Sequence, residues 1–198
     1  MKFVIFHGAY GNPEGNWFPE LKEKLEALGQ QVIVPSFPTP YNQNLNFWLS
    51  AFEKVKKEFK RGEKLCFIGH SLGPLFILHL IQKYNLKLDS AIFVSPFLEK
   101  LGKPLFDKVN KTFYKNDFDF RKLKKLIPVS YTLYSNNDPY VLSKNSIDFA
   151  KKIDSSPIIV KGAGHMNSEF GFNKFPLIVE LCKTRIELNS LQSKILTI

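Results

Sequence analysis

The sequence predicts one α/β domain, with a mostly parallel, doubly wound sheet of about six strands and helices on both faces. Short apolar runs of strand length alternate with longer segments of helical periodicity along the whole chain. The 198 residues match the length of a single domain. No internal repeat, low-complexity segment or linker divides residues 1–198. The fold expectation rests on this alternation and on the length.

The expected strands are apolar runs rich in β-branched and aromatic residues. They cover residues 3–6, 31–34, 65–68, 91–94, 129–134 and 157–160. The segments between and after them are expected to form helices over residues 17–28, 45–59, 75–81, 147–153 and 175–196. The first of these helices ends at Gly29, a residue typical of helix C-termini.

Residues 98–126 lose the strand pattern and become aromatic and basic. Their aromatic residues include Phe106, Phe113, Tyr114, Phe118 and Phe120. Two interpretations stay open for this segment. It forms a small cap or pocket wall, or it is a surface excursion whose aromatic side chains fill the main core.

The composition is that of a soluble globular protein, with 44% hydrophobic and 23% charged residues. No apolar run has the length of a membrane span, and the N-terminus is too short and too quickly polar for a signal peptide. We therefore expect a cytoplasmic protein. Cys66 and Cys182 fit no metal-ligand spacing and are expected to be small core residues. We expect no metal and no cofactor.

The net charge of +10 raises the question of an anionic partner. The lysines are scattered along helical segments, and the densest run, Lys54 to Lys64, is interrupted by Glu58 and Glu63. A second cluster covers residues 121–125. Neither cluster resembles a nucleic-acid-binding module, so a solvated lysine face is the favoured interpretation. We expect neither nucleic acid nor membrane as a partner.

The most informative stretch is Gly69-His70-Ser71-Leu72-Gly73, which follows a buried strand and precedes an apolar helix. A serine between two such glycines, in a sharp strand-to-helix turn, is typical of a nucleophile elbow. The glycines allow the strand and the helix to approach without a Cβ clash. The alternative is a glycine-rich turn with an incidental serine, but the flanking strand and helix favour the elbow.

A serine nucleophile needs a base, and the base needs a carboxylate that orients it. In α/β-hydrolases these partners follow the serine in the order acid, then histidine, at later strand ends. Asp138 follows the fifth expected strand and His165 follows the sixth. Asp138 precedes a proline, so a mere turn-forming role is the alternative. We expect His7 to support the first loop, His70 to point away from the serine and His79 to pack in its helix.

The tetrahedral intermediate of acyl transfer needs backbone amides that bind its oxyanion. One donor is expected from Leu72, directly after the serine, and the other from the glycine-rich loop after the first strand. Ala9 is the favoured donor in that loop and Tyr10 the second choice. Residues near the strand ends are expected to line the substrate pocket, namely Tyr10, Trp17, Phe97 and Met166.

The motifs around Ser71, Asp138 and His165 resemble those of the retinoblastoma-binding-protein-nine-like (YdeN-like) serine hydrolases. The similar stretches are residues 68–73, 137–140 and 164–171, together with Asn16-Trp17 and the overall length. The resemblance covers essentially the whole chain, and the stretch around His165 is its most specific part. It implies a small α/β-hydrolase without a large lid, with Ser71, His165 and Asp138 as the triad and no cofactor. The first loop, His7 to Asn12, departs from the family towards a lipase-like form.

These expectations combine into a soluble, carboxylesterase-like serine hydrolase that acts on a small acyl substrate. A protein-interaction module that keeps the hydrolase fold, with incidental catalysis, is the alternative. A protein partner cannot be read from the sequence. A nucleic-acid binder rests on the charge alone.

Overall fold

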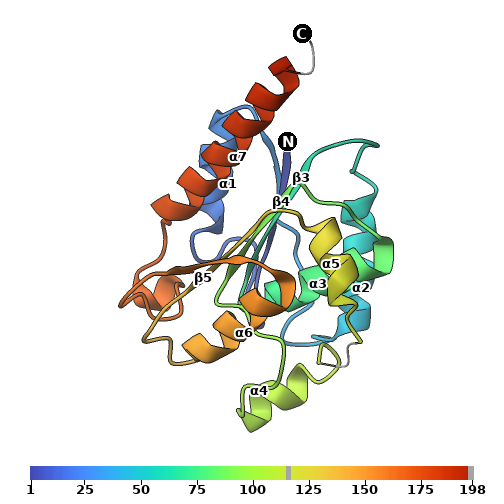
Figure 1. Ribbon diagram of the computed structural model, residues 1–198. Coiled ribbons are helices and arrows are strands. Elements are labelled where there is room, and N and C mark those ends of the chain that lie inside the picture. Colours follow the sequence, from blue (N-terminus) through green and yellow to red (C-terminus); the bar gives the residue numbers. More distant parts are fainter. Residues whose placement is uncertain (115–116, 196–198) are drawn as a thin grey trace.

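The structure is a computed structural model that describes residues 1–114 and 117–195. Its centre is a parallel sheet of six strands in the order β2-β1-β3-β4-β5-β6 (Figure 1). The strands are β1 (Lys2–Phe6), β2 (Gln31–Ile33), β3 (Leu65–His70), β4 (Ser90–Val94), β5 (Ser130–Tyr134) and β6 (Ser156–Ile159). All six expected strands are present, and each pairing between neighbours is parallel.

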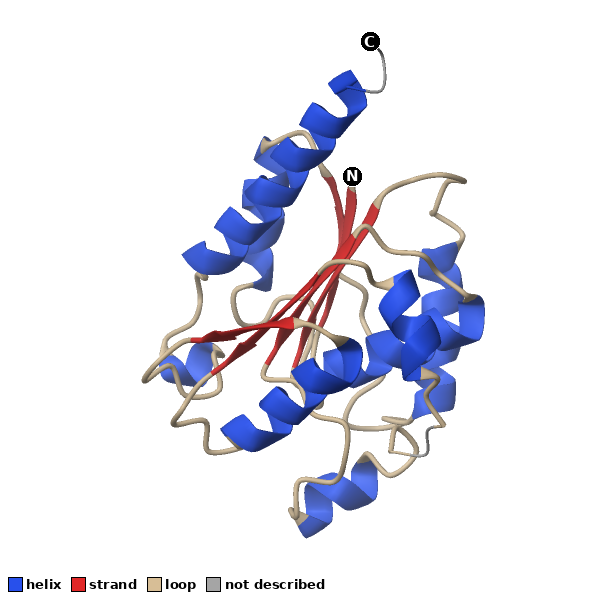
Figure 2. Cartoon of the chain, in the orientation of Figure 1, coloured by secondary structure: helices blue, strands red, loops and turns tan. Residues whose placement is uncertain are grey.

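Helices cover both faces of the sheet (Figure 2). One face carries α1 (Phe18–Ala27) and α7 (Pro176–Ile195), and the other carries α2 (Leu45–Lys56), α3 (Leu72–Tyr84), α5 (Phe120–Leu126) and α6 (Ser143–Ile153). Side chains of β1 alternate between the two layers, since Phe3 and Ile5 belong to one buried cluster and Val4 and Phe6 to the other. A strand buried on both sides requires a continuous apolar run, which is what residues 3–6 supply.

Several helix boundaries differ from the sequence-based expectation. The helix α6 begins at Ser143, earlier than the expected residue 147. The sequence did not indicate its first turn, because that turn is polar and carries no hydrophobic periodicity. The helix α3 begins at Leu72, directly after the elbow serine. The helix α2 ends at Lys56, three residues before the expected end. The predicted last residue of the C-terminal helix, Leu196, lies outside the described residues.

The segment 98–126 takes both of the roles left open above. Its helix α4 (Pro104–Val109) extends below the carboxyl edge of the sheet (Figure 1). Phe106 of α4 lines a pocket at that edge, whereas Phe113 is fully buried in the main core. Lys115 and Asn116, in the middle of the segment, lie outside the described residues.

Both cysteines lie in the core, as expected, and both are free thiols. The described part of the chain contains no helix that is long and apolar enough to cross a membrane. A short 3-10 helix, η1 (Ser168–Phe170), follows β6.

The chain moves to one side of β1 to form β2 and then to the other side to form β3. Ligands of open α/β sheets bind at the carboxyl ends of the strands beside such a switch point.

Candidate active site

The turn between β3 and α3 holds Ser71 in an uncommon backbone conformation, with φ 59° and ψ −106°. Such a conformation is costly for a residue with a Cβ and is retained where the surroundings hold it. The Ser71 N–H donates to the Val94 carbonyl at 2.8 Å, which ties the turn to β4. A Cβ on Gly73 would lie 2.6 Å from the Phe6 carbonyl oxygen. Glycine at this position is therefore required for α3 to pack against β1.

The loop after β1 lies directly against the serine. A Cβ on Gly8 would lie 2.8 Å from Ser71 Cβ and 3.4 Å from Ser71 Oγ. His7 holds this loop: it is fully buried, its Nδ1 donates to the Gly8 carbonyl at 2.8 Å, and its Nε2 accepts from Phe37 N at 3.0 Å. Burial lowers the pKa of His7, so the ring stays neutral. His7 therefore supports the loop, in agreement with the sequence-based interpretation.

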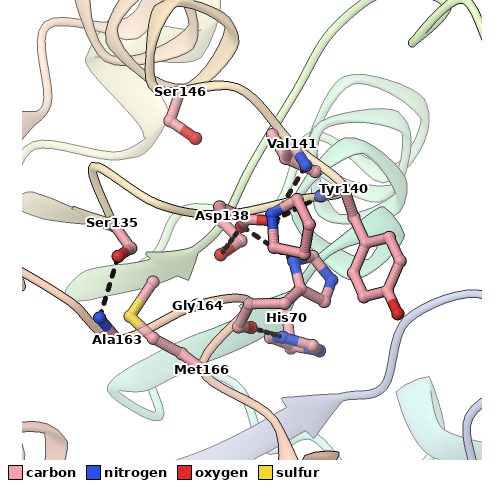
Figure 3. Close-up of polar contacts among 12 residues, drawn as sticks. His70, Ser135, Asp138, Tyr140, Val141, Ser146, Ala163, Gly164 and Met166 are labelled. Atoms are coloured by element: carbon pink, nitrogen blue, oxygen red, sulfur yellow. Dashed lines mark hydrogen bonds and ion pairs between the residues drawn. The ribbon is translucent and has the colours of Figure 1, made fainter. Parts of the chain in front are cut away.

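Asp138 and His165 follow the carboxyl ends of β5 and β6, and their side chains contact each other. Figure 3 shows Asp138 among its hydrogen-bond partners. His165 Nδ1 lies 2.8 Å from Asp138 Oδ2, and both side chains are buried. A carboxylate accepts hydrogen bonds, so the proton of a neutral His165 ring resides on Nδ1. The other ring nitrogen, Nε2, is then free to accept a proton.

Asp138 is surrounded by donors. Its Oδ2 also accepts from Ser95 Oγ at 2.9 Å, and its Oδ1 accepts from the amides of Tyr140 at 2.8 Å and Val141 at 2.9 Å. Burial raises the pKa of Asp138, but the hydrogen bonds from His165 and the two amides outweigh it, and the pKa lies below its usual value. Asp138 is therefore an anion near neutral pH.

The loop after β5 also positions the loop that carries His165. Ser135 Oγ accepts from Ala163 N at 3.0 Å (Figure 3), Asn136 Oδ1 from Gly162 N at 2.8 Å and Asn137 Oδ1 from Gly164 N at 2.9 Å. Three consecutive residues thus bind three consecutive amides that immediately precede His165. The distance between Asp138 and His165 is set by these loop contacts as well as by the direct hydrogen bond.

Two ring N–H groups hold the backbone on the other side of His165. His70 Nε2 donates to the His165 carbonyl at 2.9 Å (Figure 3), and Trp17 Nε1 donates to the Met166 carbonyl at 3.0 Å. Burial, together with the nearby His165, lowers the pKa of His70 to about 3. The ring of His70 is therefore neutral, and its Nε2 carries the proton that it donates. The sequence did not predict this contact of His70 with the loop that carries His165.

A pocket of about 320 Å³ opens above Ser71 and His165. Apolar side chains of the β1 loop, the segment 98–126 and the Asp138 loop form most of its wall, and Lys103 and Asn167 add polar groups. The lining residues are Ala9, Tyr10, Ser71, Leu101, Lys103, Phe106, Tyr140, Val141, His165 and Asn167. Ser71 and His165, predicted from separate strand ends, thus face one pocket.

Of the four residues predicted to line the pocket, Tyr10 does so. Trp17, Phe97 and Met166 are fully buried in the two core clusters and do not line it. The indole N–H of Trp17 donates to the Met166 carbonyl, so these two residues stabilise the His165 loop from the side of the core. Phe97 instead packs beside Phe106 and Tyr114. These three positions are therefore reassigned from the pocket wall to the core that supports it.

The backbone amides near Ser71 separate the two candidates for the second oxyanion donor. The Tyr10 amide already donates to Thr39 Oγ1 and Gln43 Oε1, each at 3.0 Å. Within the described ranges the amides of Ala9 and Leu72 have no hydrogen-bond acceptor. Ala9 also lines the pocket, and Leu72 is the first residue of α3. Ala9 is thus better placed than Tyr10 to bind an oxyanion.

Sequence reasoning left open a pocket wall formed by residues 98–126, including Phe106, but it did not single out Leu101 and Lys103, which also line the pocket. It also missed the role of Ser95, which directly follows β4 and donates to Asp138 Oδ2. A serine directly after a strand end was the available signal for Ser95, since the carboxyl ends of neighbouring strands share one edge.

Across residues 1–114 and 117–195, no group of three or more His, Cys, Asp or Glu side chains is placed to hold a metal ion.

A family model described as serine hydrolase matches residues 3–184. The putative hydrolase YdeN of Bacillus subtilis is 28% identical over 179 residues, which cover 89% of this chain and 92% of YdeN. Serine hydrolase RBBP9 of Rattus norvegicus is 24% identical over 173 residues, covering 85% and 89%.

Solved structures give the same fold. The crystal structure of the B. subtilis ydeN gene product superposes with a TM-score of 0.85 at 26% identity, covering 94% of this chain and 98% of that one. Est1E of Butyrivibrio proteoclasticus, solved with ferulic acid bound, has a TM-score of 0.72 at 16% identity and covers 96% and 89%. The predicted α/β-hydrolase fold is confirmed by these neighbours and by the six-stranded parallel sheet.

Proposed function

Because this chain belongs to the serine hydrolase family, we propose that it is a carboxylesterase whose catalytic triad is Ser71, His165 and Asp138. The observation that carries the proposal is the 2.8 Å contact between His165 Nδ1 and Asp138 Oδ2 beside a pocket that Ser71 and His165 both line. That contact leaves His165 Nε2 as the nitrogen free to act as a base towards Ser71.

The chemistry follows from these roles. Ser71 Oγ attacks the carbonyl carbon of the ester while His165 Nε2 takes the hydroxyl proton, giving a tetrahedral intermediate. His165 then donates this proton to the leaving alkoxide, the bond between the carbonyl carbon and the alcohol oxygen breaks, and an acyl-Ser71 ester remains. A water molecule, deprotonated by His165, attacks that ester. The acid leaves, and Ser71 regains its proton. Asp138 stays ionised and stabilises the imidazolium at each step.

The amides of Leu72 and Ala9 are the proposed oxyanion donors. Leu72 N lies at the first residue of α3, where helix amides have no intrahelical acceptor and the helix dipole favours negative charge. Ala9 N lies in the loop that Gly8 brings against Ser71. Two such preorganised donors stabilise the charge that forms on the carbonyl oxygen in the transition state.

The size of the pocket favours a substrate with a small acyl group. A volume of about 320 Å³ lies at the lower end of the range for small-molecule sites. Of the described residues in the segment 98–126, Leu101, Lys103 and Phe106 line the pocket, and the helix α4 that carries Phe106 is short, which favours a short acyl chain over a long one. Est1E was solved with ferulic acid, and a compact acid is the kind of group that we propose for this pocket too.

The test is hydrolysis of a short-chain 4-nitrophenyl ester by the wild-type protein, Ser71→Ala and Ser50→Ala. Ser50 is an exposed serine on α2 and serves as a matched control. We expect Ser71→Ala to lose turnover while Ser50→Ala keeps it, with thermal unfolding unchanged in both. Undiminished turnover in a folded Ser71→Ala protein would remove Ser71 from the mechanism. Absence of turnover in the wild-type protein would favour the alternative of an interaction module.

A further inference from the structure

Lys103 crosses the entrance of the pocket. It precedes α4 as its N-cap residue, and its Nζ reaches the Asp138 loop, where it donates to the Pro139 carbonyl at 3.1 Å. The same Nζ lies 5.2 Å from the centre of the Tyr140 ring. The Tyr140 ring in turn lies 5.1 Å from the His165 ring. A cation is therefore held beside the site where Ser71 and His165 meet the substrate.

A buried carboxylate fixes the backbone that carries this lysine. Asp107 of α4 is 8% exposed, and it accepts from Leu101 N at 3.0 Å, Lys103 N at 2.9 Å and Tyr114 Oη at 3.0 Å. Leu101 and Lys103 both line the pocket. The position of the Lys103 backbone relative to Ser71 is therefore determined by the fold, and only the side chain beyond it is free to adjust.

The charge of Lys103 has no anionic partner in the described part of the chain. No carboxylate oxygen there lies within 4.0 Å of its Nζ, and no Asp or Glu lines the pocket. The nearby Glu169 accepts from Tyr140 Oη at 2.8 and 2.9 Å. A lysine ammonium has three N–H donors. One contacts the Pro139 carbonyl, which leaves donors for a ligand.

We propose that Lys103 makes this pocket selective for carboxylic esters that carry a second, anionic carboxylate. The inference rests on the proposed esterase function and specifies its substrate class. The carboxylate of the bound ester pairs with Lys103 Nζ while the ester carbonyl lies at Ser71. A pocket of about 320 Å³ is on the order of 9 Å across if it is round. The two groups of the substrate are thus separated by a few carbon atoms.

The pairing is expected to act mainly on substrate binding. Lys103 contacts a part of the substrate that does not change during the reaction, so its loss raises KM more than it lowers kcat. Since Lys103 is exposed, water and salt weaken the pair, and we expect an effect of about threefold to fivefold rather than several hundredfold. Neutral esters have no charge to pair, so we expect them to be affected less, and the informative quantity is the ratio of kcat/KM for anionic and neutral esters.

The experiment compares two esters of the same shape. Monoethyl succinate carries the anionic carboxylate, and in ethyl 4-methylpentanoate an isopropyl group replaces it. The ratio of kcat/KM for the two esters is measured for the wild-type protein, Lys103→Met and Lys103→Arg. Lys108→Met, on an exposed residue of α4 outside the pocket, is the matched control for net charge. Acetoxyacetate, charged on its alcohol side, tests which side of the ester faces Lys103.

We expect Lys103→Met to lower the ratio of anionic to neutral turnover about threefold to fivefold, for monoethyl succinate or for acetoxyacetate. Lys103→Arg and Lys108→Met should keep the ratio within about 1.5-fold. Thermal unfolding of each variant excludes misfolding as the cause. An unchanged ratio in Lys103→Met for both anionic esters would overturn the inference, as would an equal loss in Lys108→Met. If the wild-type protein turned over none of the esters, the proposed esterase function would fail and this inference with it.

Discussion

The substitution Asp138→Asn tests the proposed triad at its carboxylate, where the structure dictates the outcome. Both oxygens of Asp138 accept two hydrogen bonds, Oδ1 from the Tyr140 and Val141 amides and Oδ2 from His165 Nδ1 and Ser95 Oγ. The two backbone amides can only donate, so the oxygen of an asparagine must take the place of Oδ1. Its amide nitrogen then replaces Oδ2 and faces His165.

The consequence is the wrong imidazole tautomer. An N–H group opposite His165 Nδ1 requires that nitrogen to accept, which moves the ring proton to Nε2. Nε2 can then no longer take the proton of Ser71. The equivalent change in a serine protease lowers kcat about 10⁴-fold, which corresponds to roughly 5 kcal/mol of transition-state stabilisation. If Asp138 only formed a turn, asparagine would serve almost as well and the loss would be at most about a few-fold.

The assay is kcat on one short-chain activated ester at saturating concentration. Asp154→Asn is the matched control, because Asp154 is exposed and adopts the left-handed conformation at the end of α6, which asparagine tolerates. We expect this control to retain its activity. Thermal unfolding of both variants separates lost catalysis from lost folding. Near-normal kcat in a folded Asp138→Asn protein would refute the tautomer argument and exclude Asp138 from the triad.

Three further predictions follow from the pocket, the charge and the buried histidine. Activated esters with short acyl chains should react faster than long-chain ones, and the opposite order in a chain-length series would contradict the small pocket. For a neutral ester, kcat/KM should change less than about twofold between low and physiological salt, because scattered charges are screened within roughly 8 Å; a tenfold fall would indicate a functional basic patch. The folded pKa of His70 is lowered from 6.5 to about 3, so the unfolded state binds more protons between these values and stability falls as the pH falls through them. Denaturant titration measures how the free energy of unfolding falls with decreasing pH. In His70→Phe this fall should be shallower than in the wild-type protein, by up to about 1.4 kcal/mol per pH unit. Equal slopes in the two proteins would show that His70 is not buried as a neutral ring.

The parallel sheet and the three candidate triad positions could be predicted from the sequence. Short apolar runs mark the strands, and a parallel sheet brings the carboxyl ends of such strands to one edge. Ser71, Asp138 and His165 each follow a strand, which is why their meeting could be expected. The start of α6 was not predicted, because Ser143 to Ser146 carry no hydrophobic periodicity.

The pocket wall could not be predicted, because it depends on how loops pack. Trp17 is a large aromatic residue near the site, but the structure buries it fully in the core and directs its indole N–H at the Met166 carbonyl. Lys103 belongs to a segment whose path over the strand ends is set by the buried Asp107 carboxylate. No sequence periodicity encodes that carboxylate's contacts.

Asp138 shows why two sequence interpretations could both hold. One oxygen binds the amides of Tyr140 and Val141, as a turn-forming aspartate does. The other oxygen binds His165, as a triad acid does. The sequence alone could not separate the turn-forming role from the triad role. A single side chain forms the turn with Oδ1 and is placed to orient His165 with Oδ2.

The most direct test of the central claim, that Ser71 is the nucleophile, is to locate a covalent adduct. The protein is treated with a fluorophosphonate, digested, and its peptides are analysed by mass spectrometry. The account predicts one phosphonyl adduct, on the peptide that contains Ser71, with no labelling of Ser71→Ala and slower labelling of Asp138→Asn. An adduct on a different serine, or no adduct on the folded wild-type protein, would contradict it.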